Sequence, residues 1–260
     1  MSLRTISVMT LFPQMVSDAF MTSITGRAVR NGIVCFSVYD IRDYTEDRNN
    51  RVDDYPFGGG AGLVMQAQPV YDCFRDIRSK LSGRPLRLVF MSPGGRVFSQ
   101  KIAHELSEEE NLVFLCGHYE GVDERALEEM GAEKLSIGDY VLTGGELPAL
   151  VVADAVIRLV PGVLHNGESV LDESFESPLL EYPQYTRPET WMGRRVPPEL
   201  LTGNHSRVAE YRRKQSEELT KEIRPDLYEL YEKSLEKADR RKELQKSIKK
   251  LSGKIKRYLK

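Results

Sequence analysis

Hydrophobic residues over the first 160 positions occur in short continuous runs that alternate with amphipathic stretches. Five apolar runs predict β-strands: residues 6–12, 33–41, 87–92, 112–117 and 134–142. Helical spacing of apolar positions predicts helices at residues 14–32, 70–81, 99–110, 123–130 and 148–160. Strands that alternate with helices and are apolar along their length are typical of a parallel sheet covered on both faces. We therefore expect an α/β fold with ligands bound beyond the carboxyl ends of its strands.

The pattern changes after residue 160. Residues 163–180 contain many turn residues and no regular period, which predicts a linker. An irregular proline-rich stretch follows, then helices at 207–223 and from Pro225 onward, with the break at the proline. The sequence thus predicts an N-terminal α/β domain over residues 1–162, a linker over 163–180, and a smaller, mainly helical C-terminal domain over 181–260.

Composition and charge narrow this picture only slightly. The chain has 260 residues, of which 40% are hydrophobic and 29% charged, which is ordinary for a folded globular protein. Its formal net charge of -2 does not indicate nucleic-acid binding. Residues 237–260, however, are rich in lysine and arginine, and apolar residues recur there at helical spacing, at Leu244, Ile248, Leu251 and Ile255. This basic helix is either a solvated surface or a contact for RNA or a second subunit.

The cysteines, histidines and apolar segments exclude several classes of protein. Three cysteines without a Cys-x-x-Cys pair indicate reduced thiols, and the four histidines lack metal-ligand spacing, so we expect no metal site. The N-terminus does not have the pattern of a signal peptide. The longest apolar stretch, residues 147–160, is interrupted by Asp154 and Arg158 and is too short to span a bilayer. We expect a cytoplasmic protein without a membrane segment.

Three glycine-bearing loops lie where predicted strands end, at 93–95, 117–121 and 144–145. None matches a phosphate-binding motif, because the lysine of a P-loop and the Gly-x-Gly-x-x-Gly spacing are both missing. Glu146 follows the third loop, and a phosphate 4 Å from its carboxylate would be repelled by roughly 1–4 kcal/mol. Glu120 places a second acid in the second loop. The loops therefore favour a neutral or cationic ligand, such as an adenosine joined to a sulfonium, although tight turns alone would also explain a single loop.

Several longer motifs resemble one family. They are "FGGGAGLVMQAQPV", "LCGHYEGVDER", "SIGDYVLTGGELPALVVADAVIRLVPGVL", "LLEYPQYTRP" and "LLTGNH" followed by "RRKQS". In this order they resemble the bacterial tRNA (guanine-N1)-methyltransferases, the TrmD family, from Val52 to Ser216. The resemblance implies an enzyme of the SPOUT class that uses S-adenosyl-L-methionine (SAM) to methylate N1 of the guanosine at tRNA position 37. It also implies a deep trefoil knot and a homodimer with the active site at the subunit interface.

By the same resemblance, a set of residues in and around the glycine loops would wrap the cofactor. These residues are Phe90, Met91, Ser92, Pro93, Gly117, Tyr119, Glu120, Gly121, Ser136, Ile137, Gly138, Asp139, Tyr140, Val141, Leu142, Gly144, Gly145 and Pro148. Magnesium is a further cofactor that the family suggests, but no ligand cluster for it is visible in the sequence.

The reaction needs a base for the guanine N1 proton and a group that stabilises charge on O6. The resemblance places the base in "LDESF", where the family has an aspartate directly before Ser-Phe and this chain has Glu173, preceded by Asp172. Either carboxylate can act, and the alignment favours Glu173. Arg158 aligns with the family arginine near O6. Its alternative role is an ion pair with Asp154 on the same helix, worth only about 0.3–0.5 kcal/mol.

Residues for tRNA contact are also implied by the resemblance. They are Asp53, Asp54, Tyr185, Arg187, Arg212, Arg213 and Lys214. His118 stands where the family often has arginine, and Ala61 where it often has proline. Two alternatives remain: a SPOUT-fold RNA-binding protein with weak catalysis, for which the glutamate at 173 is the argument, and a methyltransferase for another RNA position.

Overall fold

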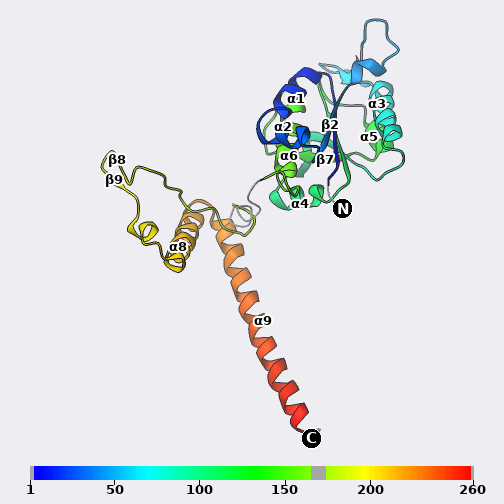
Figure 1. Cartoon of the computed structure of the whole chain (residues 1–260). Coiled ribbons are helices and arrows are strands. Elements are labelled where there is room, and N and C mark those ends of the chain that lie inside the picture. The colour runs from blue at the N-terminus through cyan, green and yellow to red at the C-terminus, as the bar shows by residue number, and fades with distance from the viewer. Residues whose placement is uncertain (1–2, 165–173, 259–260) are drawn as a thin grey trace. The chain divides into compact units, whose positions relative to one another are not determined.

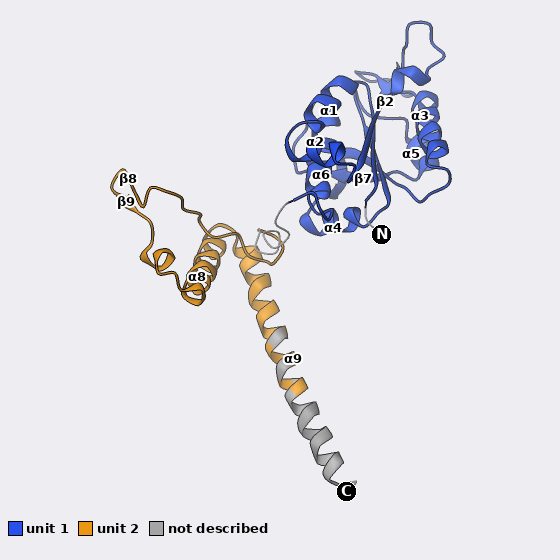
Figure 2. Ribbon diagram, viewed as in Figure 1, with its two compact units in different colours: residues 1–167 blue, residues 168–260 orange. Residues whose placement is uncertain are grey.

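The computed structural model describes residues 3–164 and 174–258. The chain forms two compact units, residues 1–167 and 168–260 (Figure 2). We call them unit 1 and unit 2. The division falls within the segment that the sequence predicts as a linker.

Unit 1 is an α/β domain built on a five-stranded parallel sheet. The sheet order is β2-β1-β6-β5-β7, from strands β1 (Thr5–Thr10), β2 (Cys35–Asp40), β5 (Arg87–Val97), β6 (Asn111–Cys116) and β7 (Glu133–Ser136). All four strand pairs are parallel. This confirms the predicted α/β class with a parallel sheet. The central strand β6 is buried at every position, as its unbroken apolar sequence predicts.

Helices cover both faces of the sheet (Figure 1). One face carries α1 (Pro13–Phe20), α2 (Ser23–Arg30), α4 (Gln100–Ser107) and α6 (Glu146–Ile157), and the other carries α3 (Ala67–Lys80) and α5 (Glu124–Met130). Side chains of β6 alternate between the two resulting cores: Leu112 and Phe114 point into the first, Val113 and Leu115 into the second. This period of two is the geometry of any strand, so a continuous apolar run serves two cores at once.

Two strand predictions are wrong at their ends, and both errors lie beside the site. The strand predicted to stop at Pro93 continues as β5 through the Pro-Gly-Gly stretch to Val97. Its register on β7 shifts between Met91 and Arg96, so that both face Leu135. Gly95 permits this bulge, because a Cβ there would lie 2.5 Å from the Leu135 backbone nitrogen. Conversely, β7 ends at Ser136, and the predicted strand residues 137–142 form a loop.

The predicted helix over residues 14–32 is two helices. α1 ends at Phe20, and α2 begins at Ser23, whose φ is +49°. The Thr25 hydroxyl donates to the Phe20 carbonyl over 2.6 Å, which satisfies a backbone acceptor that the break leaves open. A Cβ at Gly26 would lie 2.0 Å from the Met21 carbonyl oxygen, so glycine allows the second helix to pack against the end of the first.

The remaining elements of unit 1 are short. They are the 3-10 helix η1 (Ile41–Tyr44) and a two-stranded antiparallel pair of β3 (Asp53–Asp54) and β4 (Val64–Met65). β4 matters for the site because Met65 forms a bridge with Val122, just after the second glycine loop.

Unit 2 is mainly helical. It contains a hairpin of β8 (Thr190–Trp191) and β9 (Arg194–Arg195), the 3-10 helix η2 (Pro198–Leu201), and helices α8 (His205–Ile223) and α9 (Pro225–Tyr258). The helical run breaks at Arg224, before Pro225, as predicted. The segment before the hairpin is bonded to α8, since the Leu180 amide donates to the Thr220 hydroxyl over 2.8 Å. The apolar positions predicted along the basic end of α9 fall on side chains outside the described set.

Candidate functional site

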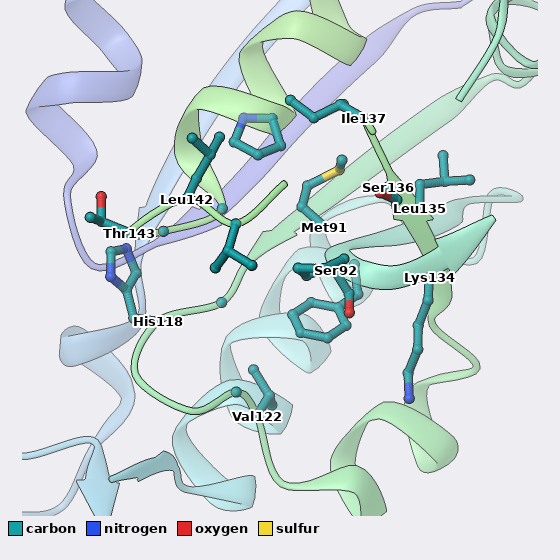
Figure 3. A pocket seen from close by; sticks show the side chains of 18 of the residues that line it. Met91, Ser92, His118, Val122, Lys134, Leu135, Ser136, Ile137, Leu142 and Thr143 are labelled. Carbon is teal, nitrogen blue, oxygen red and sulfur yellow. The ribbon is translucent and has the colours of Figure 1, made fainter. Parts of the chain in front are cut away.

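A cavity of about 400 Å³ lies beside residues 90–93 of β5 and at the carboxyl ends of β6 and β7. Its walls come from these parts of the strands, the loop 117–122, the loop 137–145 and the start of α6. Figure 3 shows Met91, Ser92 and Ile137 on one side of the space, with His118 and Thr143 on another. The position agrees with the general rule for α/β sheets. The volume lies within the range typical of small-molecule sites.

The first wall loop is fastened by backbone hydrogen bonds to the chain around β4. The Glu120 amide donates to the Leu63 carbonyl, and the Met65 amide donates to the Gly121 carbonyl, each over 2.9 Å. Tyr119 takes a left-handed conformation with φ of +59°. Burial, and then the neighbouring Asp53 carboxylate to which its hydroxyl donates, raise the pKa of Tyr119. The loop therefore has a defined shape before any ligand binds.

The second wall loop approaches the first at its glycines. The Gly145 amide donates to the Gly117 carbonyl over 3.0 Å, and a Cβ at Gly145 would lie 2.7 Å from the Cys116 Cα. A Cβ at Gly144 would lie 2.3 Å from the His118 ring. Earlier in the loop Gly138 has φ of +146°, and its amide donates to the Ser136 hydroxyl over 3.2 Å. Glycine is required here for backbone conformation and for close approach of the two loops.

A buried carboxylate joins the loops to β1. Glu146 is 2% exposed at the start of α6, and its Oε1 accepts from the Thr10 hydroxyl over 2.5 Å. The His118 Nε2 lies 2.8 Å from both carboxylate oxygens of Glu146. Phe12 packs against the His118 ring at 4.9 Å between centroids. Burial, and then the Glu146 carboxylate, raise the pKa of the neighbouring Cys116 thiol well above its ordinary value. This network holds loop 117–121, loop 144–145 and the end of β1 together.

The charges around the cavity do not suit a polyphosphate. Glu120 and Glu124 line it, and Glu146 is buried beside it. Lys134 also lines it and forms a salt bridge with Glu124, in which Nζ lies 2.6 and 2.8 Å from the two carboxylate oxygens. The carboxylates favour a neutral or cationic ligand, as the sequence predicts.

The structure brings nearly all the predicted cofactor residues around this one cavity. Of that set, Asp139 alone is not among the lining residues. Seven lining residues were not predicted: His118, Val122, Glu124, Leu127, Lys134, Leu135 and Thr143. Most are neighbours of predicted ones. The Lys134–Glu124 pair joins β7 to α5, and no local sequence pattern indicates such a pair.

The predicted catalytic residues are only partly described. Glu173 and Asp172 lie outside the described residues, so their role stays a prediction. Arg158 is the C-cap residue directly after α6, and its amide donates to the Asp154 carbonyl over 3.3 Å. It is partly buried and is not among the residues that line the cavity.

The predicted tRNA residues fall into different environments. Asp53 is 9% exposed and accepts a hydrogen bond from the Tyr119 hydroxyl, whereas Asp54 is exposed. In unit 2, Tyr185, Arg187 and Arg212 line one cavity of about 550 Å³. The other two members of the set, Arg213 and Lys214, are exposed on α8, where they lie 3.8 Å from Glu217 and Glu218.

The described residues contain neither a metal-binding group nor a helix that could span a membrane. Within residues 3–164 and 174–258, no three His, Cys, Asp or Glu side chains are grouped so that they could hold a metal ion. Every helix in this part of the chain is too short or too polar to cross a membrane.

Comparison with known proteins gives a consistent result. The sequence profile of the family described as tRNA (Guanine-1)-methyltransferase TrmD matches residues 4–230. The tRNA (guanine-N(1)-)-methyltransferase of Lachnospira eligens is 57% identical over 226 residues, which are 87% of this chain and 95% of that protein. The proteins of the same name from Clostridium beijerinckii and Clostridioides difficile are 54% and 47% identical, over 86% and 88% of this chain and 91% and 98% of their own lengths. The chain belongs to the TrmD family of tRNA (guanine-1)-methyltransferases.

Proposed function

We propose that this protein transfers the methyl group of SAM to N1 of guanosine in tRNA, at position 37. The observation that carries the proposal is the cavity at the strand ends, whose glycine loops and carboxylates suit an adenosine with a cationic methyl donor. Membership of the TrmD family and the names of its relatives support the same reaction.

The cavity residues fit SAM in shape and chemistry. Met91, Ile137 and Leu142 offer apolar surface for an adenine ring. At Gly117, Gly144 and Gly145 the absence of a Cβ keeps the loop backbone close to the cavity, where amide and carbonyl groups are available for hydrogen bonds. The carboxylates of Glu120 and Glu146 stabilise positive charge nearby. When bound, SAM supplies an electrophilic methyl group on a sulfonium.

The chain's own groups then deal with the guanine. We propose that Glu173, or Asp172 one position earlier, accepts the N1 proton so that the N1 lone pair becomes available. Arg158 stabilises the negative charge that this leaves on O6. The new N1–methyl bond forms as the methyl–sulfur bond breaks, and the sulfur keeps that electron pair. Holding both reactants in line supplies a large part of the acceleration.

A homodimer is part of the proposal, supported by an exposed apolar surface on α1 and α6. Four large apolar side chains there are about half exposed: Phe12 (47%), Met15 (43%), Leu147 (49%) and Val151 (51%). Helix α6 is apolar on nearly all sides, so its outward face is apolar as well. The two helices pack against each other. Exposed large apolar side chains on neighbouring helices are a feature of subunit interfaces. A second copy of this chain is the occupant that the family implies.

The trefoil knot of the SPOUT class also remains a proposal. Strand β7 lies at the edge of the sheet, yet α6, which follows it, packs against the central strands β1 and β6. To reach them, the chain passes so close to loop 117–121 that Gly145 bonds to Gly117. This return from the edge to the centre supports the knotted path.

Magnesium and location complete the proposal. Magnesium is proposed from the family resemblance alone, because no group of ligands for it is present among the described residues. A magnesium requirement is tested by chelation with EDTA while SAM binding and methyl transfer are measured separately.

A cytoplasmic location follows from the proposed substrate, since tRNA is used there.

The direct test is transfer of labelled methyl from SAM to two unmodified tRNA transcripts, one with guanosine and one with adenosine at position 37. We expect label on the guanosine transcript alone. SAM binding without transfer to either would instead favour the RNA-binding alternative, and label that maps to another nucleotide would favour a different RNA position. Comparing Glu173→Gln with Asp172→Asn identifies the base, and full activity in both variants would refute a carboxylate base in this segment.

A further inference from the structure

The loop of residues 174–181 begins directly after the candidate base and is closed on itself. The Glu181 amide donates to the Ser174 hydroxyl over 2.8 Å, which joins the last residue of the loop to the first. Glu173 lies outside the described residues, but the peptide bond ties it to Ser174, and consecutive Cα atoms lie about 3.8 Å apart. Whatever fixes the loop therefore also fixes the point from which the base projects.

The backbone of this loop is strained at Phe175. Its φ is +73°, a left-handed conformation that an aromatic residue rarely adopts. The side chain is 52% exposed, so burial of the ring does not account for this conformation. Instead, the Phe175 amide donates to the Leu179 carbonyl over 3.4 Å inside the loop. Strained backbone of this kind persists where neighbouring bonds determine it, and it occurs mainly at functional sites.

The loop is fastened to helix α8 at Thr220. The Leu180 amide donates to the Thr220 hydroxyl over 2.8 Å, and that hydroxyl donates to the Ser216 carbonyl over 2.6 Å. Thr220 is fully buried and Ser216 is 7% exposed. A hydroxyl that donates its proton in one fixed direction aims its lone pairs in fixed directions as well. The acceptor that holds Leu180 is therefore well oriented.

Only one of these two bonds is explained by the helix itself. A threonine hydroxyl that bonds to the carbonyl four residues earlier is common within helices and needs no further role. The bond to the Leu180 amide leaves the helix and reaches the loop that follows the candidate base. A second contact follows at the next side chain but one, where the Arg212 guanidinium carbon lies 4.8 Å from the centroid of the Tyr182 ring.

We propose that Thr220 is a positioning residue for methyl transfer, because it fastens the loop 174–181 to α8 and so sets where the carboxylate at Glu173 or Asp172 stands. This inference rests on the proposed function, since it takes that carboxylate as the base. The carboxylate and α8 both belong to unit 2, whereas the cofactor cavity belongs to unit 1. Loss of the anchor should therefore slow proton removal and leave SAM binding intact.

The test compares Thr220→Val with Thr220→Ser in the full chain. Valine keeps the shape and removes the hydroxyl, and serine keeps the hydroxyl. We expect the single-turnover rate on an unmodified tRNA transcript to fall by about 10-fold to 100-fold in Thr220→Val, since misplacement by about 1 Å costs up to roughly that much. Thr220→Ser should stay within about threefold. The dissociation constants for SAM and for tRNA should be unchanged in both variants.

The control is Ser234→Ala. Ser234 is exposed on α9, and its hydroxyl donates to the Tyr231 carbonyl over 2.7 Å within that helix. The variant removes a helix hydroxyl that bonds to no loop, so the rate should not change.

Two further measurements separate positioning from a structural role. The first repeats Thr220→Val in whichever of Glu173→Gln and Asp172→Asn lowers the rate. There it should cause no further loss, because no base is left to position. The second is the pH profile. In Thr220→Val the rate should keep rising with pH where that of the unmodified protein has levelled off, because hydroxide from solvent then takes the N1 proton.

Ser174→Ala replaces Thr220→Val if valine lowers the thermal midpoint. It opens the loop at its partly buried first residue and leaves α8 unchanged. The same loss of rate and the same pH profile are expected.

Three results would overturn the inference. The first is a near-native rate in both Thr220→Val and Ser174→Ala. The second is a loss in Thr220→Val that is equally large with and without the base, which would assign Thr220 to the stability of α8. The third is full activity in both Glu173→Gln and Asp172→Asn. None of these is confused with failure of the proposed function, since that failure is the absence of methyl transfer by the unmodified protein.

Discussion

Replacing His118 by alanine tests whether the buried network organises the cofactor cavity. In the native protein the Glu146 carboxylate is 2% exposed and accepts from His118 and Thr10. In the variant the carboxylate loses the imidazole donor and keeps the Thr10 hydroxyl. The missing ring also opens space beside Gly144. Loss of one partner of a buried charged group costs about 2–3 kcal/mol.

The loss of this hydrogen bond should lower both the stability of the fold and the affinity for SAM. For a domain of this size about 2–3 kcal/mol corresponds to a fall of roughly 4–12 °C in the thermal midpoint. Because His118 joins the two loops that line the cavity, we also expect the dissociation constant for SAM to rise by about tenfold or more, measured by calorimetry. The control is His104→Ala, which removes an exposed histidine on α4, outside the residues that line the cavity, and should leave the dissociation constant for SAM unchanged.

The double variant His118→Ala/Glu146→Gln separates the buried charge from lost packing. Glutamine has nearly the same shape as glutamate and no charge, so it should recover part of the SAM affinity that His118→Ala loses. A coupling energy of at least about 1 kcal/mol between the two positions is expected for groups in contact. Strictly additive effects, or an unchanged midpoint in His118→Ala, would refute the assignment of this network.

Four further outcomes follow from the structure. Gly145→Ala should abolish SAM binding or destabilise unit 1, measured by calorimetry and thermal unfolding, because its Cβ would lie 2.7 Å from the Cys116 Cα. Burial raises the pKa of the Cys73 and Cys116 thiols, so the folded state keeps protons that the unfolded chain releases above about pH 8.5. The free energy of unfolding, measured by urea titration, should therefore fall as pH rises beyond that value. In a variant with alanine at both positions it should depend less steeply on pH. Leu147→Asp should shift sedimentation from dimer to monomer, since it places a charge on the exposed apolar face of α6. Arg158→Ala should lower the turnover number by about 100-fold or more and change the dissociation constant for SAM little, and a near-native turnover number would exclude its role at O6.

The sequence predicts the core of unit 1 well, because burial there follows from local pattern. Strand β6 is apolar at Leu112, Val113, Phe114 and Leu115, and a strand with two cores requires this. It predicts the ends of elements less well. The extension of β5 past Pro93 depends on pairing with β7, which is distant in the chain.

The site shows the same division between local and distant information. Glycines at strand ends mark the cavity, since close approach and positive φ are properties of single positions. The Thr10–Glu146–His118 network joins residues up to 136 positions apart, and its buried carboxylate resembles an ordinary first-turn helix acid in the sequence. The burial of Asp53 beneath Tyr119 is likewise invisible in a motif that otherwise indicates an exposed contact residue.

The backbone bonds between the cavity loops also affect how the protein folds. These bonds join three separate stretches of chain, around residues 63–65, 117–121 and 145. The first and third stretches are both hydrogen-bonded to the second. No stretch can take its final shape alone, so the binding cavity forms only after contacts of long sequence separation are made, which are the slow ones in folding. SAM at 100 times its dissociation constant would stabilise that final state by about 2.7 kcal/mol. Cofactor concentration thus acts on the fraction of chains that are folded as well as on the rate of the reaction.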